Sequence, residues 1–570
     1  MKKNVIKICI AVAVVVAIIA GGFLIAVKAS PKFKNDVKLA MLKVFPNAKH
    51  VCYYYVDGKP VHDMNSVDLE NCKSDVKEIQ KSREKTYVIN HARGYALEFG
   101  PDAEFDFTTD GEFFTATQKD MKITVSKEFS PYERDQLKVE YIDKCLNEYF
   151  INERFAEHNR ITIHKDNMEQ INGYWMQVSA ISREPAPGSE VELNTYVQCI
   201  IYRDDRTYYR IMFKGKKYDD YLIDQVYKTL FSFTEEVDII GTTGTYTDFK
   251  PVENPNWSEE TKELYEEIKN SPKVKWGVYS PWTVIDNNFD KIDEIEEKLD
   301  YNFEGTIEYL YLGQELPVEG MKAAYEDGKI VELTLQTSTV MNLDLDSYNI
   351  MFDIVDGQKD HEIRTLACSI RDFGHPILFR LNNEMNSDWT TYGGNITLND
   401  PEIFVQVWRR FYDIFEQEGV NNAIWVFNPN DNSFPPCGFN SSIAYYPGNE
   451  YVHMFGITGY NTGTYYEEKY MEKWREFDEI YEDITKSSEK IYGAFPWVIT
   501  EFASSSVGGD KGEWINNMFK NIHKFPRIKM AFWFSSADYD ADNNNAVARP
   551  YWIDENEDSV NAFKENLKKY

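Results

Sequence analysis

Short apolar runs recur along the C-terminal half of the chain, and each has the pattern of a buried strand. Three of them, KWGVYS at 275–280, TIEYLYL at 306–312 and IVELTL at 330–335, are separated by enough residues for a helix. Five more lie near Ile377, Ile424, Met454, Val498 and Phe532. Continuous apolar runs are typical of parallel strands that are buried on both faces. Eight such runs in roughly 300 residues predict an α/β domain with the (β/α)8 TIM barrel architecture.

A polar cap followed by an apolar stripe predicts one of the barrel helices in detail. Asp400 can accept hydrogen bonds from the free N–H groups of a first helical turn, and Pro401 fits that turn. Gly419 is a suitable residue to end the helix. Between them the apolar residues have helical spacing and are Phe404, Val407, Trp408, Phe411 and Phe415. We expect this stripe to pack on the barrel.

The hydrophobic pattern upstream of the barrel predicts a different kind of domain. Tyr174–Ala180, Asn194–Tyr202 and Thr207–Phe213 have the alternation of antiparallel strands, and the last two are close enough to form a hairpin. Asp219–Phe231 has the pattern of a closing helix. We therefore expect an α+β accessory domain over about residues 31–240, with a packing or spacer role. Glycan binding through its tyrosines is the alternative.

Residues 241–257, GTTGTYTDFKPVENPNW, are rich in Gly, Thr and Pro and have no apolar period. Such a composition is typical of a linker between domains. The predicted organisation is therefore an accessory domain at 31–240, a linker at 241–257 and a barrel domain at 258–570.

The first 30 residues have the pattern of a membrane segment. Ile8–Val27 comprises 20 residues without a charge, enough for a helix to span a bilayer. Lys2, Lys3 and Lys7 precede it, and such positive flanks remain in the cytoplasm. A transmembrane anchor with the rest of the chain outside the cell is expected. The alternative is an export signal that is cleaved off.

The charge of the chain narrows the classes of partner. A formal net charge of −31 would repel nucleic acid and anionic lipid surfaces, whereas a neutral glycan is compatible with it. The pattern predicts no cofactor and no metal site. Asp538, Asp540 and Asp542 alternate in one loop, but the glycine and distal glutamate of an EF-hand are missing. This loop is expected to be solvated.

Two of the predicted strands end abruptly in polar residues around a glutamate. Pro376–Phe379 leads to Glu384, and Phe495–Ile499 leads to Glu501. The carboxyl ends of parallel strands are where α/β proteins bind their ligands. Paired carboxyl groups suit glycoside hydrolysis, because one can donate a proton while the other, ionised, attacks the anomeric carbon or activates water. The alternative is that each glutamate caps an element or pairs with an arginine.

Four segments around these glutamates resemble the successive motifs of glycoside hydrolase family 26. They are FRLNNEMNSDW at 379–389, IWVFNPN at 424–430, YYPGNEYV at 445–452 and VITEF at 498–502. The family consists largely of β-mannanases, with some β-1,3-xylanases and mixed-linkage glucanases, and belongs to the clan of retaining (β/α)8 enzymes. The resemblance covers roughly residues 275–570 and occurs in the order of the family's motifs.

The resemblance implies roles for individual residues near the two glutamates. Glu384 matches the acid/base at the end of strand 4, and Glu501 matches the nucleophile at the end of strand 7. Arg380 matches an arginine that orients the carboxylates. Asn383 stands where family mannanases usually have histidine, and it would reach the sugar 2-hydroxyl, the group at which mannose and glucose differ. This departure weakens the inference of mannan specificity but leaves the reaction type unchanged.

Three aromatic residues are also implied as parts of the substrate site. Trp389 matches a residue that lines the cleft, and Tyr460 matches the tyrosine that hydrogen-bonds the nucleophile. Trp533 matches the strand 8 platform beneath the sugar at the cleavage point. Core packing is the alternative for each, because aromatic residues make up 15% of the chain.

The resemblance and the pattern together predict a membrane-anchored, extracytoplasmic endo-β-glycanase of retaining mechanism, whose partner is a β-linked polysaccharide. Two alternatives remain at this point. The barrel could have lost turnover and serve as a glycan-binding scaffold, or it could transfer the glycosyl group to another sugar within surface polysaccharide assembly.

Overall fold

The computed structural model describes residues 23, 26–44, 51–69, 71–109, 111–130, 146–241, 243–338 and 344–569. In this described part of the chain, no helix has both the length and the apolar character that a membrane span requires. The expected span Ile8–Val27 lies largely outside it.

The chain forms two compact units whose boundaries differ from the expected ones. Unit 1 comprises Met1–Glu133, Ile163–Ser182 and Glu192–Thr247. Unit 2 comprises Arg134–Thr162, Arg183–Val191 and Asp248–Tyr570. Two segments within the predicted accessory domain therefore belong to the barrel unit, and the predicted linker is divided between the units.

Unit 1 contains two sheets whose described pairings are antiparallel. The first has the order β2-β1-β3-β4-β5, with the bounds β1 Val51–Val56, β2 Lys59–Val61, β3 Lys77–Lys81, β4 Thr86–Asn90 and β5 Tyr95–Phe99. The second has the order β6-β7-β8-β12-β11-β10-β9, with the bounds β6 Glu104–Asp106, β7 Phe114–Gln118, β8 Met121–Phe129, β9 Ile161–Ile171, β10 Tyr174–Arg183, β11 Thr195–Tyr202 and β12 Thr207–Gly215. The helical elements of this unit are α2 Pro31–Val44, η1 Met64–Ser66 and α5 Asp220–Phe231.

The elements predicted for the end of unit 1 are confirmed. Strands β11 and β12 form the expected hairpin, with Tyr202 opposite Tyr208. Helix α5 begins after Asp219, whose side chain accepts a hydrogen bond from the backbone N–H of Leu222. Val226 of α5 is fully buried in a core that both sheets share. The strands of the first sheet were not predicted, because they are short, with three to six residues each.

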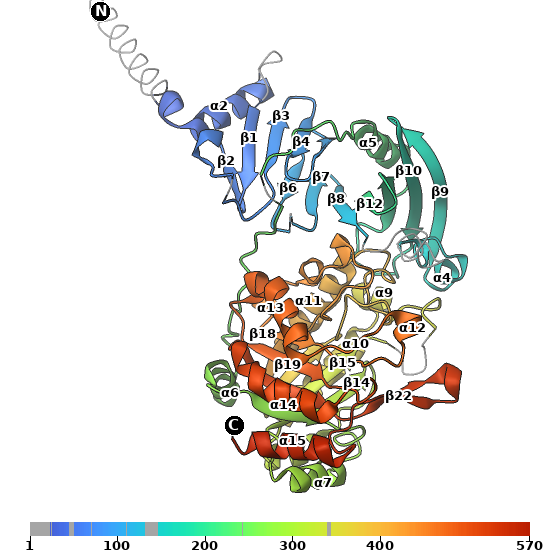
Figure 1. The fold of residues 1–570 in the computed structure, drawn as a ribbon. Helices are drawn as coiled ribbons and strands as arrows, with labels where there is room; N and C mark the ends of the chain where they lie inside the picture. Colours follow the sequence, from blue (N-terminus) through green and yellow to red (C-terminus); the bar gives the residue numbers. More distant parts are fainter. Residues whose placement is uncertain are drawn as a thin grey trace, which may run out of the picture. The chain divides into compact units, whose positions relative to one another are not determined.

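Unit 2 contains the predicted barrel of eight parallel strands (Figure 1). The strands are β13 Lys275–Tyr279, β14 Gly305–Tyr311, β15 Ile330–Gln336, β16 Ile377–Leu381, β17 Ala423–Phe427, β18 Met454–Thr458, β19 Trp497–Phe502 and β20 Ile528–Phe534. Each pairs with its neighbours in sequence, and β20 closes the barrel against β13. The eight apolar runs are thus confirmed as the strands of one (β/α)8 barrel.

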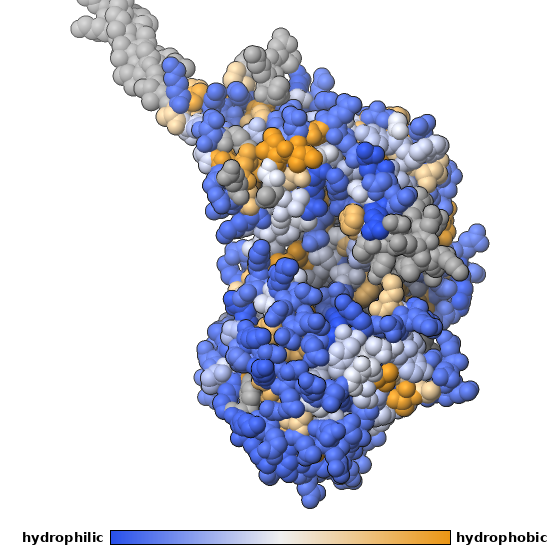
Figure 2. Space-filling view, viewed as in Figure 1, coloured by the Kyte–Doolittle hydropathy of each residue, from blue (hydrophilic) through white to orange (hydrophobic). Residues whose placement is uncertain are grey.

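Helices cover the outside of this barrel. The α-helices of unit 2 are α4 Glu153–His158, α6 Glu259–Asn270, α7 Asp290–Leu299, α8 Val318–Glu326, α9 Ile350–Val355, α10 Asp360–Phe373, α11 Glu402–Gln417, α12 Glu467–Tyr470, α13 Phe477–Tyr492, α14 Lys511–Asn521 and α15 Glu557–Leu567. The shorter elements are η2 Gly438–Asn440, η3 Ser442–Tyr445, η4 Asn449–Tyr451, η5 Ile522–Lys524, η6 Ala541–Asn543 and the hairpin of β21 Ala537–Asp540 and β22 Ala546–Pro550. The surface over α7, α14 and α15 is mostly hydrophilic, as the charge of the chain requires (Figure 2).

Helix α11 confirms the predicted stripe, but its start differs from the prediction: the helix begins at Glu402, with Pro401 in the N-cap position and no side-chain cap hydrogen bond. Asp400 accepts a hydrogen bond from the backbone N–H of Glu402 at 3.2 Å. The stripe is buried throughout and consists of Phe404, Val407, Trp408, Phe411 and Phe415. Phe415 packs against Phe379 of β16 and Trp425 of β17. This packing fixes the strand that leads into the polar segment after Leu381.

The C-terminal half of the predicted linker is attached to the barrel. Asn449 accepts a hydrogen bond from the N–H of Lys250 through its side chain and one from Val252 through its carbonyl oxygen. The indole N–H of Trp257 donates to the carbonyl of Ala423 at 3.0 Å. Trp257 also belongs to the apolar core inside the barrel. Residues 248–257 are therefore part of the barrel unit, which corrects the prediction of a linker there.

Asp356 at the end of α9 holds the segment 183–191 in the barrel unit. Arg183 donates to both of its carboxylate oxygens, at 2.7 and 3.0 Å. The N–H of Ala186 and the hydroxyl of Ser189 donate to the same carboxylate, at 2.8 and 2.7 Å. Burial raises the pKa of Asp356, but these donors outweigh burial and the pKa is lower than usual. Contacts between residues far apart in sequence thus decide the unit to which this segment belongs.

Candidate active site

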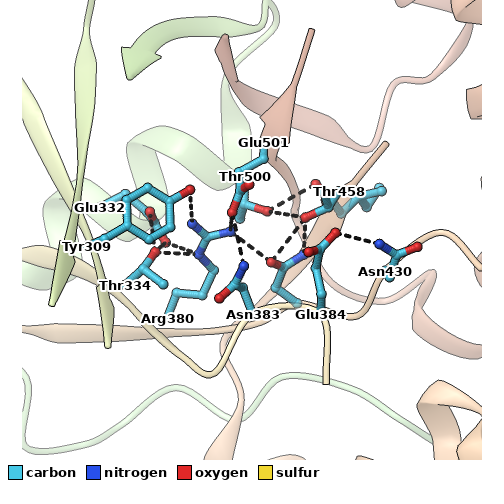
Figure 3. Close-up of polar contacts among 12 residues, drawn as sticks. Tyr309, Glu332, Thr334, Arg380, Asn383, Glu384, Asn430, Thr458, Thr500 and Glu501 are labelled. Carbon is cyan, nitrogen blue, oxygen red and sulfur yellow. Dashed lines mark hydrogen bonds and ion pairs between the residues drawn. The ribbon is translucent and has the colours of Figure 1, made fainter. Parts of the chain in front are cut away.

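Arg380 on β16 is the centre of a polar network at the C-terminal ends of the barrel strands (Figure 3). Its guanidinium is fully buried and donates to Glu501 at 2.6 Å, to the Asn428 side chain at 2.9 Å and to Thr334 at 2.7 Å. It also forms an ion pair with Glu332 of β15 at 2.7 Å. The planar guanidinium therefore fixes side chains from several strands.

Glu332 is a charge partner that the sequence analysis missed. Burial raises the pKa of this carboxyl to about 7, although Arg380 lowers it. The hydroxyl of Thr334 donates to both of its oxygens. Glu332 faces Arg380 from the side opposite to Glu501 in Figure 3, so the two carboxyls share one buried cation.

Glu501 lies in β19 where an extra residue distorts the strand. Ile499 pairs with Ala531 and Phe502 with Trp533, so three steps along β19 match two along β20. Such a bulge re-aims the side chains beside it. The Glu501 carboxylate accepts from Arg380 on one oxygen and from the Tyr460 hydroxyl on the other, at 3.0 Å. Donors on both oxygens hold the carboxylate in one orientation.

Glu384 follows β16 in a backbone conformation that is uncommon for its residue type. Its φ is 55° and that of Asn382 is 56°, both in the left-handed region. The N–H of Glu384 donates to the Asn428 carbonyl at 2.9 Å, which fixes the chain there. The Asn430 side chain donates to the Glu384 carboxyl (Figure 3). Strained backbone that the surroundings enforce is typical of functional sites.

The surroundings of Glu384 favour its protonated form. Burial and the negative charge of Glu501 raise the pKa of this carboxyl, the hydrogen bond from Asn430 lowers it, and the net result is a pKa of about 8. Glu384, whose protonated form is favoured, thus lies near Glu501, to which Arg380 and Tyr460 donate hydrogen bonds. Such a pair can supply both a proton donor and a nucleophile to one bond.

Asn383 lies between the two glutamates with its amide orientation fixed. Its side-chain oxygen accepts hydrogen bonds from Gln336 at 2.9 Å and from the Tyr392 hydroxyl at 3.1 Å. Its Nδ2 donates to Glu501 at 3.4 Å. With both acceptor positions of the oxygen occupied, the amide can offer only N–H groups to a bound molecule.

Aromatic rings form one wall of the site. Tyr279 of β13 packs edge-on against Tyr309 of β14 at 5.1 Å and stacks on Phe534 of β20 at 4.7 Å. The ring of Tyr460 packs against those of Phe534 and Tyr551, with distances between ring centroids of 5.9 and 5.1 Å. Arg380 donates to the Tyr309 hydroxyl at 3.2 Å, and the Tyr460 hydroxyl donates to Glu501, so this wall adjoins the polar network.

Trp389 and Trp533, both predicted in the site, have different environments. Trp389, on the segment after Glu384, is 51% exposed and therefore accessible to a ligand. Trp533 is only 1% exposed and packs against Trp514 of α14 and Phe563 of α15, away from the barrel interior. The prediction of a sugar platform at Trp533 is wrong. Side chains alternate along a strand, and Phe534, the next residue, contacts the site instead.

The remaining predicted residues come together: Glu384, Glu501, Arg380, Asn383 and Tyr460 all belong to one network. Seven other residues of the network were not predicted: Glu332, Thr334, Tyr309, Asn428, Asn430, Gln336 and Tyr392. Asn428 and Asn430 lie in the motif IWVFNPN, so their position after a predicted strand was a usable signal. The others are single residues in or near strands, and only the closed barrel brings them together.

The described residues include no group of three or more His, Cys, Asp or Glu side chains that could hold a metal ion. The alternating aspartates each have a protein partner. Asp538 accepts from Arg549 at 2.8 Å, Asp540 from Tyr465 at 3.2 Å, and Asp542 from Lys469 at 3.0 Å.

Comparisons with known proteins match the barrel part of the chain to one family. Residues 259–548, just over half of the chain, match the model of glycosyl hydrolase family 26. Endoglucanase H of Acetivibrio thermocellus is 30% identical over 215 residues, which are 37% of this chain and 22% of that protein. A mannan endo-1,4-β-mannosidase of Bacillus subtilis is 28% identical over 101 residues, which are 17% of this chain and 26% of that protein. The matches thus span only about a quarter of these relatives.

The solved structures that match part of the chain include a family 26 β-mannanase from Bacteroides ovatus, with a TM-score of 0.41, 16% identity and coverage of 55% of this chain and 93% of that one. A mannanase from Bacillus subtilis has a TM-score of 0.36, 18% identity and coverage of 50% and 88%. The match to the family model covers the barrel and both glutamates of the network. The chain therefore belongs to glycosyl hydrolase family 26.

Proposed function

We propose that this protein is a retaining endo-β-glycanase in which Glu384 is the acid/base and Glu501 the nucleophile. The contrast between the two carboxyls carries the proposal. Burial and the nearby negative charge raise the pKa of Glu384 to about 8, whereas Arg380 and Tyr460 donate hydrogen bonds to Glu501. One group thus has a proton to give at neutral pH, and the other is held for attack.

The reaction follows from these positions in two steps. In the first, Glu501 attacks the anomeric carbon, the glycosidic C–O bond breaks, and Glu384 gives its proton to the leaving oxygen. In the second, the Glu384 carboxylate takes a proton from water, whose oxygen attacks the anomeric carbon and displaces Glu501. Two displacements retain the anomeric configuration. Asn383 would donate to the sugar 2-hydroxyl beside the reacting carbon, where such a contact strengthens in the transition state.

The proposed substrate is a β-linked glucan or mannan. Relatives named as an endoglucanase and as a mannan endo-1,4-β-mannosidase support this range. Asn383, in place of the histidine expected of family mannanases, favours the glucan. The test is hydrolysis of mannan, mixed-linkage glucan, β-1,3-xylan and the producing cell's own polysaccharide, with the anomeric configuration of the first product followed by NMR. Inverted products contradict the mechanism, and product chains longer than the substrate show glycosyl transfer.

Two variants test the assigned roles. Glu501→Ala should abolish turnover, because no intermediate can form. Glu384→Ala should lose about 10²–10⁴-fold on polysaccharide but still react with an aryl glycoside, whose leaving group needs no proton, and added azide should restore its second step. Glu513→Ala on the exposed face of α14 is the control. Near-normal hydrolysis by both site variants contradicts the pair and leaves a glycan-binding scaffold as the better explanation.

We also propose that Ile8–Val27 anchors the protein in the cell membrane with the barrel outside. The support is the uncharged run preceded by Lys2, Lys3 and Lys7. Protease added to intact protoplasts should remove the barrel, and washed membranes should retain the full-length protein. A soluble form that begins near Ser30 would show a cleaved export signal instead. A barrel that is digested only after lysis contradicts the orientation.

A further inference from the structure

The loop between β13 and α7 carries a tryptophan in an unusual conformation. Trp282 is 70% exposed, and its φ of 65° lies in the left-handed region. Large aromatic residues are rarely left so exposed, and residues with a Cβ rarely adopt this backbone. The loop follows β13 at the C-terminal edge of the barrel, the same edge that carries the two glutamates. The exposure of Trp282 and its left-handed backbone conformation therefore both need an explanation.

The structure holds this loop rigidly. Glu308 of β14 is buried, and its carboxyl accepts from the backbone N–H of Ile285 at 2.9 Å. The Thr283 hydroxyl donates to the Ser280 carbonyl at 2.9 Å. The N–H of Asp286 donates to the Trp282 carbonyl at 3.1 Å. Trp282 is therefore displayed on a fixed support.

Helix α8 packs against the same loop at very short range. A Cβ on Gly320 would lie 1.8 Å from the carbonyl oxygen of Val284, so only glycine permits this approach. The loop is thus braced from one side by β14 and from another by α8. A braced loop that keeps a strained residue exposed is the arrangement expected of a binding surface.

Aromatic side chains connect this loop to the reacting groups. Tyr279, three residues before Trp282, packs against Tyr309, whose hydroxyl accepts a hydrogen bond from Arg380, the residue that also donates to Glu501. On the other side, the exposed Trp389 follows β16. Strands β13 and β16 are the first and fourth of eight, so their loops lie on nearly opposite sides of the barrel mouth.

We propose, on the basis of the function proposed above, that Trp282 is a stacking platform for a sugar ring of the β-glycan chain beyond the residues at the cleavage point. The faces of pyranose rings carry C–H groups that pack on an indole, and such contacts need no charge. A chain that enters over Trp282 and passes Glu501 and Glu384 would leave towards Trp389. The site would therefore favour long chains over short ones.

Chain length is the variable that tests this role. With the polysaccharide that the wild-type enzyme hydrolyses, oligosaccharides of two to six sugars are compared with an aryl glycoside of one sugar. For Trp282→Ala, kcat/KM on the hexasaccharide should fall about tenfold, the size of one aromatic contact. The aryl glycoside should react as with wild type, and Trp282→Phe should recover most of the loss.

The matched control is Trp175→Ala in unit 1, where the tryptophan is 56% exposed. It should leave the chain-length dependence unchanged. Equal losses on the hexasaccharide and the aryl glycoside would show a general effect on the site and overturn the platform, as would no loss on either.

A binding measurement separates this inference from the proposed function. Glu501→Ala and Glu501→Ala/Trp282→Ala are titrated with mannohexaose and with a mixed-linkage glucan hexasaccharide by calorimetry. Loss of about tenfold in affinity in the double variant supports the platform even if the wild type proves inactive. Equal affinities overturn it, even if hydrolysis by the wild type upholds the two-glutamate mechanism.

Discussion

Glu384 and Glu501 are chemically identical side chains whose neighbours make them different. Arg380 and Tyr460 donate to Glu501, whereas Glu384 accepts from the neutral amide of Asn430 and lies in the field of a negative charge. The positive charge of the site is thus directed to one carboxyl. At the scale of single residues, division of labour comes from the placement of hydrogen-bond donors.

The pH dependence of hydrolysis should report the proton on Glu384. Because its pKa is raised to about 8 and the acid form is required, kcat/KM on polysaccharide should fall as the pH rises through about 8. Asn430→Ala removes a hydrogen bond that lowers this pKa, so the fall should move to higher pH. An aryl glycoside with a good leaving group is the control, and its kcat/KM should not show this fall. If Asn430→Ala leaves the pH of this fall unchanged, the fall does not report the proton on Glu384.

The same proton should appear in the stability of the barrel. A carboxyl whose folded-state pKa is raised stabilises the fold below its unfolded pKa, near 4.5, and this contribution is lost as the pH rises through about 8. Glu384→Gln cannot ionise, so it should melt higher than wild type at pH 8.5 and at nearly the same temperature at pH 4. Each 1 kcal/mol corresponds to about 2–4 °C. A difference that is constant with pH would show that ionisation is not its cause.

At the scale of elements, the loops and bulges at the ends of the strands position the site. The irregular stretch of β19 aims Glu501 inward, and the loop after β13 is braced by β14 and α8. These features interrupt regular secondary structure, so each needs support from a neighbouring element. The barrel provides it through side chains such as Glu308 and through close approach at Gly320.

Replacing Gly320 in helix α8 by alanine should change the stability of the barrel in the direction opposite to that of most Gly→Ala substitutions in helices. Replacing glycine by alanine inside a helix normally stabilises it by about 0.5–1 kcal/mol. Here the added methyl meets the Val284 carbonyl, so Gly320→Ala should destabilise the barrel by about 1–3 kcal/mol in urea unfolding. Lys322→Ala, exposed on the same helix, should change little. Stabilisation by Gly320→Ala would show that α8 does not pack closely against the loop at Val284.

At the scale of the whole molecule, the barrel unit includes segments from the region before it. Residues 146–162 and 183–191 pack with the barrel, and Asn399 donates to the Leu146 carbonyl at 2.7 Å. Arg183 supplies a buried cation to Asp356. The barrel is therefore not the simple C-terminal part of the chain.

Arg183→Met should destabilise the barrel by about 3–5 kcal/mol, because it leaves Asp356 buried with fewer partners. The pKa of Asp356 is lower than usual, so its contribution is present above its unfolded pKa and is lost on acidification. The defect should therefore shrink as the pH falls towards 3. Arg203→Met, which removes an exposed ion pair with Glu235, should cost less than about 1 kcal/mol. Equal losses of stability in Arg183→Met and Arg203→Met would contradict the proposed role of the ion pair between Arg183 and Asp356.

Several features of this protein follow from the sequence alone. The eight apolar runs predicted the strands of the barrel, since a strand buried on both faces must be apolar throughout. The apolar stripe of α11 and the hairpin of β11 and β12 depend on neighbouring residues and were also predictable. Glu384 and Glu501 could be predicted because one follows a recognisable strand and the other lies near the end of one, each within a motif.

Only the tertiary structure decided the rest. Whether Trp533 or Phe534 contacts the site depends on the register of one strand, and a shift of one residue reverses it. Glu332 and Asn428 meet Arg380 from other strands, and Arg183 joins Asp356 across 173 residues of chain. The raised pKa of Glu384 requires burial and a negative charge at close range. Local pattern determines elements, but burial, register and long-range pairing arise only when those elements pack together.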